Sequence, residues 1–134
     1  MWEIPRILIN KVLGHAQRSA PEECVGVLTG EGRRVRGWRP LTNVLADSRR
    51  FMADPAQQLV AFREIRDSGQ SVVAIYHSHP TGPAEPSALD LQQAAYPEVL
   101  QLIVSLAEDG RMDLGGFLVQ EGRAKSQVIT ITEG

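Results

Sequence analysis

The chain of 134 residues has 43% apolar and 22% charged residues, which suits a globular protein with one domain over residues 1–134. Its net charge of −2 argues against a nucleic-acid surface, and no apolar run approaches the roughly 18 residues of a membrane span. The single cysteine, Cys24, excludes an internal disulfide framework. Since no signal peptide is visible, we expect a cytoplasmic protein.

The first half of the chain predicts a helix, a hairpin and a second helix. Apolar residues at helical spacing predict the first helix, with Pro5 in its first turn and Pro21 ending it. The segments "EECVGVLTGEG" and "RRVRGWRPLTN" predict two strands joined by a glycine turn. After a loop at 44–53, "DPAQQLVAFREIRDSG" predicts a helix with Asp54 as its cap and Gln57 as the capping-box partner. Its expected apolar face is Leu59, Val60, Phe62 and Ile65.

The second half predicts buried strands around a short helix. The run "SVVAIYH" is typical of a central strand covered on both faces. A third helix is expected from about Ser87 to Ala95, before Pro97, and "EVLQLIVSLA" predicts another buried strand. The segments "DLGGFLVQEG" and "AKSQVITIT" predict a closing hairpin around Glu121-Gly122. The fold class is therefore α/β, a mixed sheet with packed helices.

The stretch "YHSHPTGPAEPSALDL" contains the pattern of a metal site. His77 and His79 stand two apart on a strand, so both imidazoles point to one face. The Pro/Gly-rich loop that follows turns the chain back and delivers Asp90. Two imidazoles and a carboxylate leave one position open for water, which is typical of catalytic zinc.

A plainer interpretation of the same residues is a strand end followed by a helix cap. Ser87-x-x-Asp90 is an ordinary capping pattern, and the two interpretations are compatible because a cap could hold the loop that aims Asp90. A hydrolase would also need a proton shuttle. Glu22 and Glu23 are the candidates, and strand alternation alone does not choose between them.

These motifs together resemble the JAMM motif of MPN+ metalloproteases in the Mov34/MPN/PAD-1 superfamily. That motif has an early glutamate, then His-[Ser/Thr]-His-Pro, then Ser-x-x-Asp. The matching residues here are Glu23, His77-Ser78-His79-Pro80, and Ser87 with Asp90. The run Glu23-Cys24-Val25-Gly26 selects Glu23 over Glu22, and "LTN" before an F-x-x-D-P helix start is also typical.

The resemblance implies a single MPN domain of the cytidine-deaminase-like fold, with a mixed curved β-sheet. It also implies that His77, His79 and Asp90 bind Zn²⁺. Glu23 would be the general base and then acid, and Ser87 would stabilise the oxyanion. The compact size resembles bacterial members that hydrolyse an amide or isopeptide bond at the tail of a ubiquitin-like, ThiS/MoaD-type sulfur-carrier protein.

Two rival functions remain at this point. A catalytically inactive MPN scaffold would typically lose motif residues, whereas this chain keeps all five. A RadC-like, DNA-associated protein would typically read His-Asn-His-Pro-Ser-Gly, from which Ser78 and Thr81 depart. His15 is expected to be a surface residue and Cys24 a small buried one. Trp2 is expected to anchor the first helix or to contribute to a homodimer contact.

Overall fold

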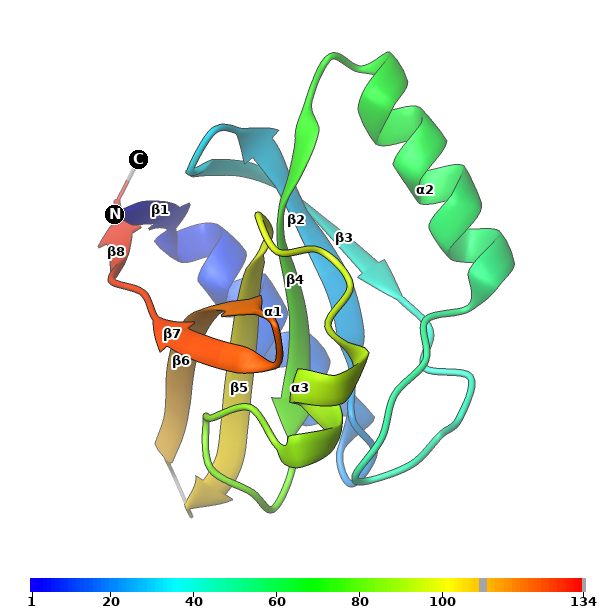
Figure 1. Ribbon diagram of the computed structural model, residues 1–134, viewed down its shortest axis with the longest axis vertical. Helices are drawn as coiled ribbons and strands as arrows, with labels where there is room; N and C mark the ends of the chain where they lie inside the picture. Colours follow the sequence, from blue (N-terminus) through cyan, green and yellow to red (C-terminus); the bar gives the residue numbers. More distant parts are fainter. Residues whose placement is uncertain (109–110, 134) are drawn as a thin grey trace.

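The computed structural model describes residues 1–108 and 111–133, which form one curled, mixed sheet with helices on both faces (Figure 1). Eight strands among these residues follow the order β7-β6-β5-β4-β2-β3-β1-β8. The strands are β1 (Trp2–Pro5), β2 (Val25–Glu31), β3 (Arg34–Leu41), β4 (Ser71–His79), β5 (Leu100–Glu108), β6 (Arg111–Gln120), β7 (Arg123–Ser126) and β8 (Ile129–Thr132). The helices are α1 (Arg6–Ser19), α2 (Pro55–Asp67) and α3 (Ala88–Gln93).

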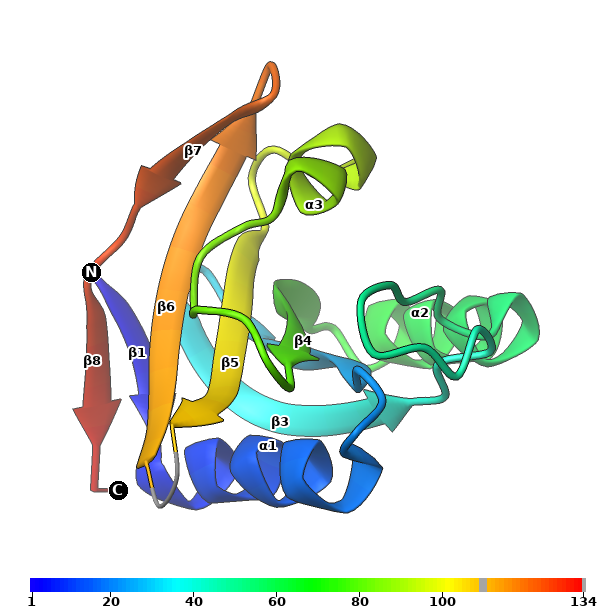
Figure 2. The same ribbon diagram turned by 90° about the horizontal axis from the view of Figure 1, so that it is seen from below.

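Strand β4 is the central strand that its apolar run predicted. It pairs antiparallel with β2 and parallel with β5, so both of its edges are occupied. From Ala74 to Tyr76 its side chains alternate between two cores. Ala74 and Tyr76 pack with α1 on one face, whereas Ile75 packs with α2 on the other. Figure 2 shows α1 on one side of the curled sheet and α2 and α3 on the other.

The N-terminal segment differs from its prediction. Pro5 is not in the first helical turn: it is extended, with φ −60° and ψ 141°, and it ends strand β1 before α1 begins at Arg6. Trp2 lies on β1, is only 3% exposed and shares the core with Leu8 and Val12 of α1, as the anchor interpretation predicted. A four-residue strand is too short to show a period of its own.

Helix α2 confirms its predicted start and half of its predicted apolar face, since Phe62 and Ile65 pack in the core while Leu59 and Val60 do not. Asp54 accepts hydrogen bonds from the backbone N–H groups of Ala56 and Gln57. The Gln57 side chain bonds Thr42 at the end of β3 instead of closing a capping box. The buried stripe is Ala61 and Ile65, one turn apart, so Leu59 and Val60 point away from it and are 56% and 50% exposed.

The predicted closing hairpin is only half right. β6 and β7 do turn at Glu121-Gly122, where both residues have positive φ. The chain then leaves this edge, and β8 pairs in parallel with β1 at the opposite edge. The sheet is curled, which lets Gln127 bond the carbonyl of Gly116 while Trp2 bonds the carbonyl of Val128. No helix in the described part of the chain is long and apolar enough to cross a membrane.

His15 is not the surface residue that we expected. It is half-buried on α1, and its Nδ1 lies 2.7 Å from the hydroxyl of the fully buried Tyr76. The indole N–H of Trp38 donates to the same hydroxyl oxygen at 2.9 Å. The Tyr76 O–H is therefore directed at His15, whose Nδ1 accepts and whose proton sits on Nε2. Burial, followed by the nearby charge of Arg18, lowers the pKa of His15.

Candidate metal centre and active site

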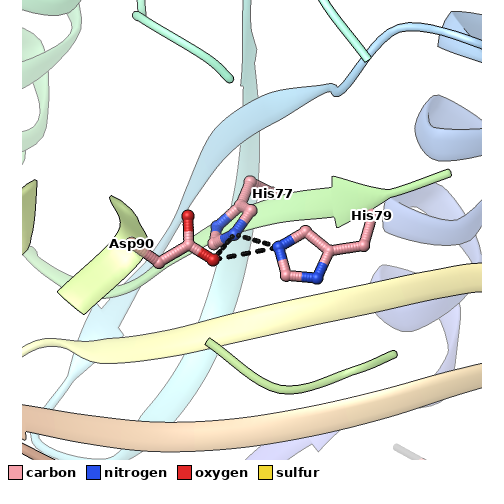
Figure 3. A group of neighbouring side chains, drawn as sticks. All are labelled: His77, His79 and Asp90. Carbon is pink, nitrogen blue, oxygen red and sulfur yellow. Dashed lines mark hydrogen bonds and ion pairs between the residues drawn. The ribbon is translucent and has the colours of Figure 1, made fainter. Parts of the chain in front are cut away.

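Three predicted ligands converge on one point at the end of β4 (Figure 3). The Nε2 atoms of His77 and His79 lie 3.1 Å apart, and Asp90 Oδ2 lies 3.1 Å and 2.9 Å from them. Both histidines face the α2/α3 side of the sheet, because residues two apart on a strand share a face. His77 is 2% and His79 7% exposed. The three donor atoms form a compact cluster that could hold a metal ion.

The helix cap is present as well, and it aims Asp90. Ser87 Oγ accepts from the backbone N–H of Asp90 at 3.1 Å, and the backbone N–H of Ser87 donates to Asp90 Oδ2 at 2.9 Å. This capping box starts α3. The carboxylate oxygen that meets the two imidazoles is therefore held by the cap. The two interpretations of the sequence describe one arrangement.

The loop between β4 and α3 is fixed to the sheet at several points. His79 Nδ1 donates to the carbonyl oxygen of Pro83 at 2.7 Å, so a neutral His79 would present the lone pair of Nε2 to a metal ion. Ser105 Oγ on β5 donates to the carbonyl oxygen of Gly82 at 2.6 Å. On β6, a Cβ on Gly115 would lie 2.2 Å from the carbonyl oxygen of Ala84. The absence of a side chain at Gly115 lets the loop lie against the sheet.

Glu23 is brought beside this cluster by Ser78, the residue between the two histidines. Ser78 is fully buried, and its Oγ accepts from the backbone N–H of Cys24 at 2.8 Å. The backbone N–H of Ser78 donates to the Cys24 carbonyl at 3.2 Å. Glu23 is 3% exposed, whereas Glu22 is exposed. Glu23 Oε1 is buried with no hydrogen-bond partner in the described residues.

Asn43 ties the 44–53 loop to the backbone of Glu23. Its Nδ2 donates to the carbonyl oxygens of Glu23 and Arg50, at 3.0 Å and 3.1 Å. Its Oδ1 accepts from the backbone N–H groups of Leu45 and Met52. One amide side chain thus satisfies four backbone groups of this loop and of the segment before β2. The loop has a defined shape around Glu23.

The same loop reaches both sides of the cluster. The backbone N–H of Glu23 donates to the carbonyl of Asp47 at 2.8 Å. The ring of Phe51 stacks on the imidazole of His77, with centroids 4.6 Å apart and planes 26° apart. The loop therefore fixes the backbone at Glu23 and the ring of His77 together.

Burial is the main cause of the pKa shift of Glu23. Burial raises its pKa to about 7, the charges of Asp90 and Asp47 add to the rise, and His79 opposes it. A carboxyl group with a pKa near neutral can both accept and release a proton under ordinary conditions. Its position and its pKa therefore suit a proton shuttle.

The pKa values of the three clustered residues shift in different directions, and the result is an ionised Asp90. Burial lowers the pKa of His77, against the hydrogen bond to Asp90. Burial also disfavours protonated His79, but the hydrogen bonds to Asp90 and Pro83 outweigh it and raise the pKa of His79. Burial would raise the pKa of Asp90, yet hydrogen bonds from both histidines hold it well below its usual range. Asp90 is thus a carboxylate, the form that binds cations.

Residues of the cluster line two clefts. An apolar cleft of about 300 Å³ lies between α2, α3 and the sheet, and His77 and Asp90 form part of its wall. The rest of its wall includes Val27, Phe51, Phe62, Ile103 and Tyr96. A second cleft, of about 320 Å³, is lined by Glu23, His79, Ser87, Arg49 and Glu85. The second is referred to as the polar cleft, because charged side chains stand in its wall.

The structure brings together all five residues singled out in the sequence, Glu23, His77, His79, Ser87 and Asp90. It adds supporting residues to which no function was assigned: Asn43, Phe51, Ser78, Ser105 and Gly115. Asn43, Phe51 and Ser78 stand inside the stretches that carried the resemblance, so a signal was present for them. Ser105 and Gly115 had no local signal, since their role depends on a loop that is distant in sequence.

A curled sheet that presents two histidines and an aspartate beside a buried glutamate is the arrangement of a metal-dependent hydrolase. Residues 5–115 match the family described as prokaryotic homologs of the JAB domain. The chain belongs to this family. It is a JAB-type hydrolase of the JAMM peptidase class, as the sequence predicted.

Named relatives and a solved structure agree with this assignment. The CysO-cysteine peptidase of Mycobacterium tuberculosis is 30% identical over 128 residues, covering 94% of this chain and 88% of the relative. The probable TtuB-protein conjugate cleaving protease of Thermus thermophilus is 36% identical over 129 residues, covering 94% and 81%. A JAB1/MPN domain protein from Archaeoglobus fulgidus, 19% identical, shares the fold with a TM-score of 0.63 over 99% and 100% of the two chains. The predicted MPN fold is confirmed.

Proposed function

We propose that this protein is a zinc-dependent peptidase that hydrolyses an amide or isopeptide bond at the C-terminal tail of a ubiquitin-like sulfur-carrier protein. The observation that carries the proposal is the meeting of His77, His79 and Asp90 beside the buried, unbonded carboxylate oxygen of Glu23. The names of the relatives, one acting on a CysO-cysteine bond and one on TtuB-protein conjugates, support the class of substrate.

The donor set suits zinc. Two neutral imidazoles and one carboxylate are a common set of protein ligands for catalytic zinc. The hydrogen bond from His79 Nδ1 to Pro83 fixes the tautomer that a ligand needs, and Asp90 is held as a carboxylate. Bound there, zinc would supply Lewis acidity and lower the pKa of water from 15.7 toward ~7. His77, His79 and Asp90 would hold it.

The remaining chemistry belongs to Glu23 and Ser87. Glu23 takes a proton from the attacking water and gives it to the nitrogen that leaves, and its pKa of about 7 suits both steps. The Ser87 hydroxyl accepts from the backbone N–H of Asp90, so its own proton is available for the carbonyl oxygen as negative charge develops. The C–N bond breaks, and the water oxygen stays on the carbonyl carbon.

The two clefts predict how the two sides of the scissile bond are oriented in the site. Because Glu23 delivers its proton to the leaving nitrogen, the amine side of the bond lies in the polar cleft that Glu23 lines. The acyl side, which is the tail of the carrier, then lies toward the apolar cleft beside His77 and Asp90. An extended tail would gain affinity there from backbone hydrogen bonds and specificity from apolar contacts.

The test compares Glu23→Gln with Asp90→Ala, using zinc content and hydrolysis of a carrier-protein conjugate as readouts. Glu23→Gln is expected to keep about one zinc per chain and to lose hydrolysis by at least about 100-fold, because only the proton shuttle is removed. Asp90→Ala is expected to lose both. Glu22→Gln, at the exposed neighbouring position, is the matched control and should behave like the wild type.

Two results would contradict the proposal. Near-normal turnover in Glu23→Gln would remove the role of Glu23. A protein that takes up no zinc when zinc is offered would favour the inactive scaffold, and the cluster would then be only a strand end and a helix cap.

A further inference from the structure

The two imidazoles of the cluster differ in what supports their rings. His79 donates its Nδ1–H to the carbonyl oxygen of Pro83, the kind of partner that a metal-binding histidine usually has. His77 has no such partner, because its Nδ1 is buried and forms no hydrogen bond with any residue that the structure describes. The orientation of the His77 ring is therefore not fixed by a hydrogen bond at Nδ1.

The ring of Phe51 lies flat against the imidazole of His77 instead. The two rings are stacked, with centroids 4.6 Å apart and planes 26° apart. The ring of His79 is also close to His77, at 4.9 Å between centroids, but it is tilted by 58°. A nearly parallel neighbour restricts the rotation of an imidazole about its Cβ–Cγ bond, because the turning ring would collide with it. The stack with Phe51 thus limits the directions in which His77 Nε2 can point.

Phe51 is itself held in place by the backbone on both sides of it. Asn43 Oδ1 accepts from the N–H of Met52 at 3.0 Å, and Asn43 Nδ2 donates to the carbonyl oxygen of Arg50 at 3.1 Å. The Phe51 side chain also packs against the core between α2 and the sheet. A ring that is fixed by its backbone and by its core contacts can in turn fix the ring that stacks on it.

We propose that Phe51 is a positioning residue for the metal ligand His77. Its stack on the imidazole replaces the hydrogen bond that His77 lacks and holds Nε2 in the direction that a metal requires. The inference rests on the proposed function, since it takes His77 to be a zinc ligand. The 44–53 loop then has two separate effects on the site, because Asn43 and Asp47 hold the backbone of Glu23 whereas Phe51 sets the affinity for zinc.

The test measures the zinc affinity of the full chain by competition with a chelator, for the wild type and for three variants at position 51. Phe51→Leu and Phe51→Met keep an apolar side chain but remove the flat ring, so the affinity should fall about tenfold in both. Phe51→Tyr keeps the ring and should stay within about twofold of the wild type. The visible absorption of the cobalt-substituted proteins, which reports ligand geometry, should change in the first two variants and not in the third.

Phe62→Leu is the matched control for the loss of a ring. Phe62 lines the same apolar cleft, but its ring contacts Tyr96, with centroids 6.4 Å apart. Its zinc affinity and cobalt spectrum should match those of the wild type, and urea unfolding of the metal-free proteins checks that every variant is folded.

Three results would overturn the inference and leave the proposed function intact. The first is a zinc affinity within about twofold of the wild type in Phe51→Leu and Phe51→Met. The second is an equal loss in Phe62→Leu, which would assign the effect to the packing of the cleft. The third is an equal loss in Phe51→Tyr, which would assign it to a disturbed loop. A wild type that binds no zinc would reject the proposed function as well.

Discussion

Replacing Gly115 with alanine should weaken metal binding without touching a ligand. The new Cβ would lie 2.2 Å from the carbonyl oxygen of Ala84 and 2.8 Å from the ring of Phe117. The loop would have to retreat by about 1 Å to reach ordinary contact. That loop also bonds His79 through Pro83 and leads to Asp90. Metal sites require ligand distances within about 0.2 Å, and lost support typically costs about 10–100-fold in affinity. We expect a loss of that size for zinc.

The assay is a competition titration of zinc against a chromogenic chelator, together with urea unfolding of the metal-free proteins. Gly116→Ala is the control, because the atoms nearest its Cβ would be side-chain carbons and not the loop backbone: Ile129 Cδ1 at 2.7 Å, Ile129 Cγ1 at 3.1 Å and Leu100 Cδ1 at 3.3 Å. Its free energy of unfolding should fall by at most about 1–3 kcal/mol because of overpacking, and its zinc affinity should stay the same. Zinc affinity in Gly115→Ala within twofold of the wild type, or an equal loss in both variants, would refute the reasoning.

Two further predictions concern other parts of the molecule. Asn43→Asp keeps the two hydrogen bonds accepted from Leu45 and Met52 but sets a carboxylate against two carbonyl oxygens. The rate of hydrolysis should fall about tenfold or more while the zinc content stays unchanged. An unchanged rate would argue against a role of Asn43 in positioning the backbone of Glu23. The lowered pKa of His15 favours its neutral form in the fold, so its contribution to stability is present above the unfolded pKa of about 6.5 and is lost as pH falls below it. The difference in unfolding free energy between wild type and His15→Gln should therefore shrink from pH 7.5 to pH 5.5 in urea titrations, and a constant difference would contradict this.

Local patterns were sufficient for the elements around the site. The apolar run ending at His77 gave a central strand, and the Ser87-x-x-Asp90 pattern gave a real capping box. Both depend on contacts within one or two turns of chain. The predictions were wrong where pairing with a strand distant in the sequence determines the structure. Pro5 ends a strand because β1 pairs with β8, and the end of the chain leaves its hairpin for the same reason.

The site residues were likewise predictable where the signal is local in the sequence and not where it depends on distant strands. Two histidines two apart and a spaced aspartate are visible in one short stretch, because all three lie within 14 residues of one another. Selecting Glu23 over Glu22 required the resemblance, since alternation leaves both open. The supports of the loop, Ser105 and Gly115, are contributed by strands β5 and β6. No periodicity relates them to the loop, so only the tertiary structure could identify them.

The pairing of β1 with β8 also limits when this protein can finish folding during its synthesis. Trp2 and Gln127 form a side-chain hydrogen bond across 125 positions, and Arg6 and Glu133 form an ion pair across 127. Strand β1 is made first, but its strand pairing is limited to Glu3 with Arg34 of β3 until β8 has left the ribosome. Contacts of such long range form slowly. The proposed metal ligands and proton shuttle all lie before residue 91. They can therefore assemble on the inner strands before β1 has paired with β8.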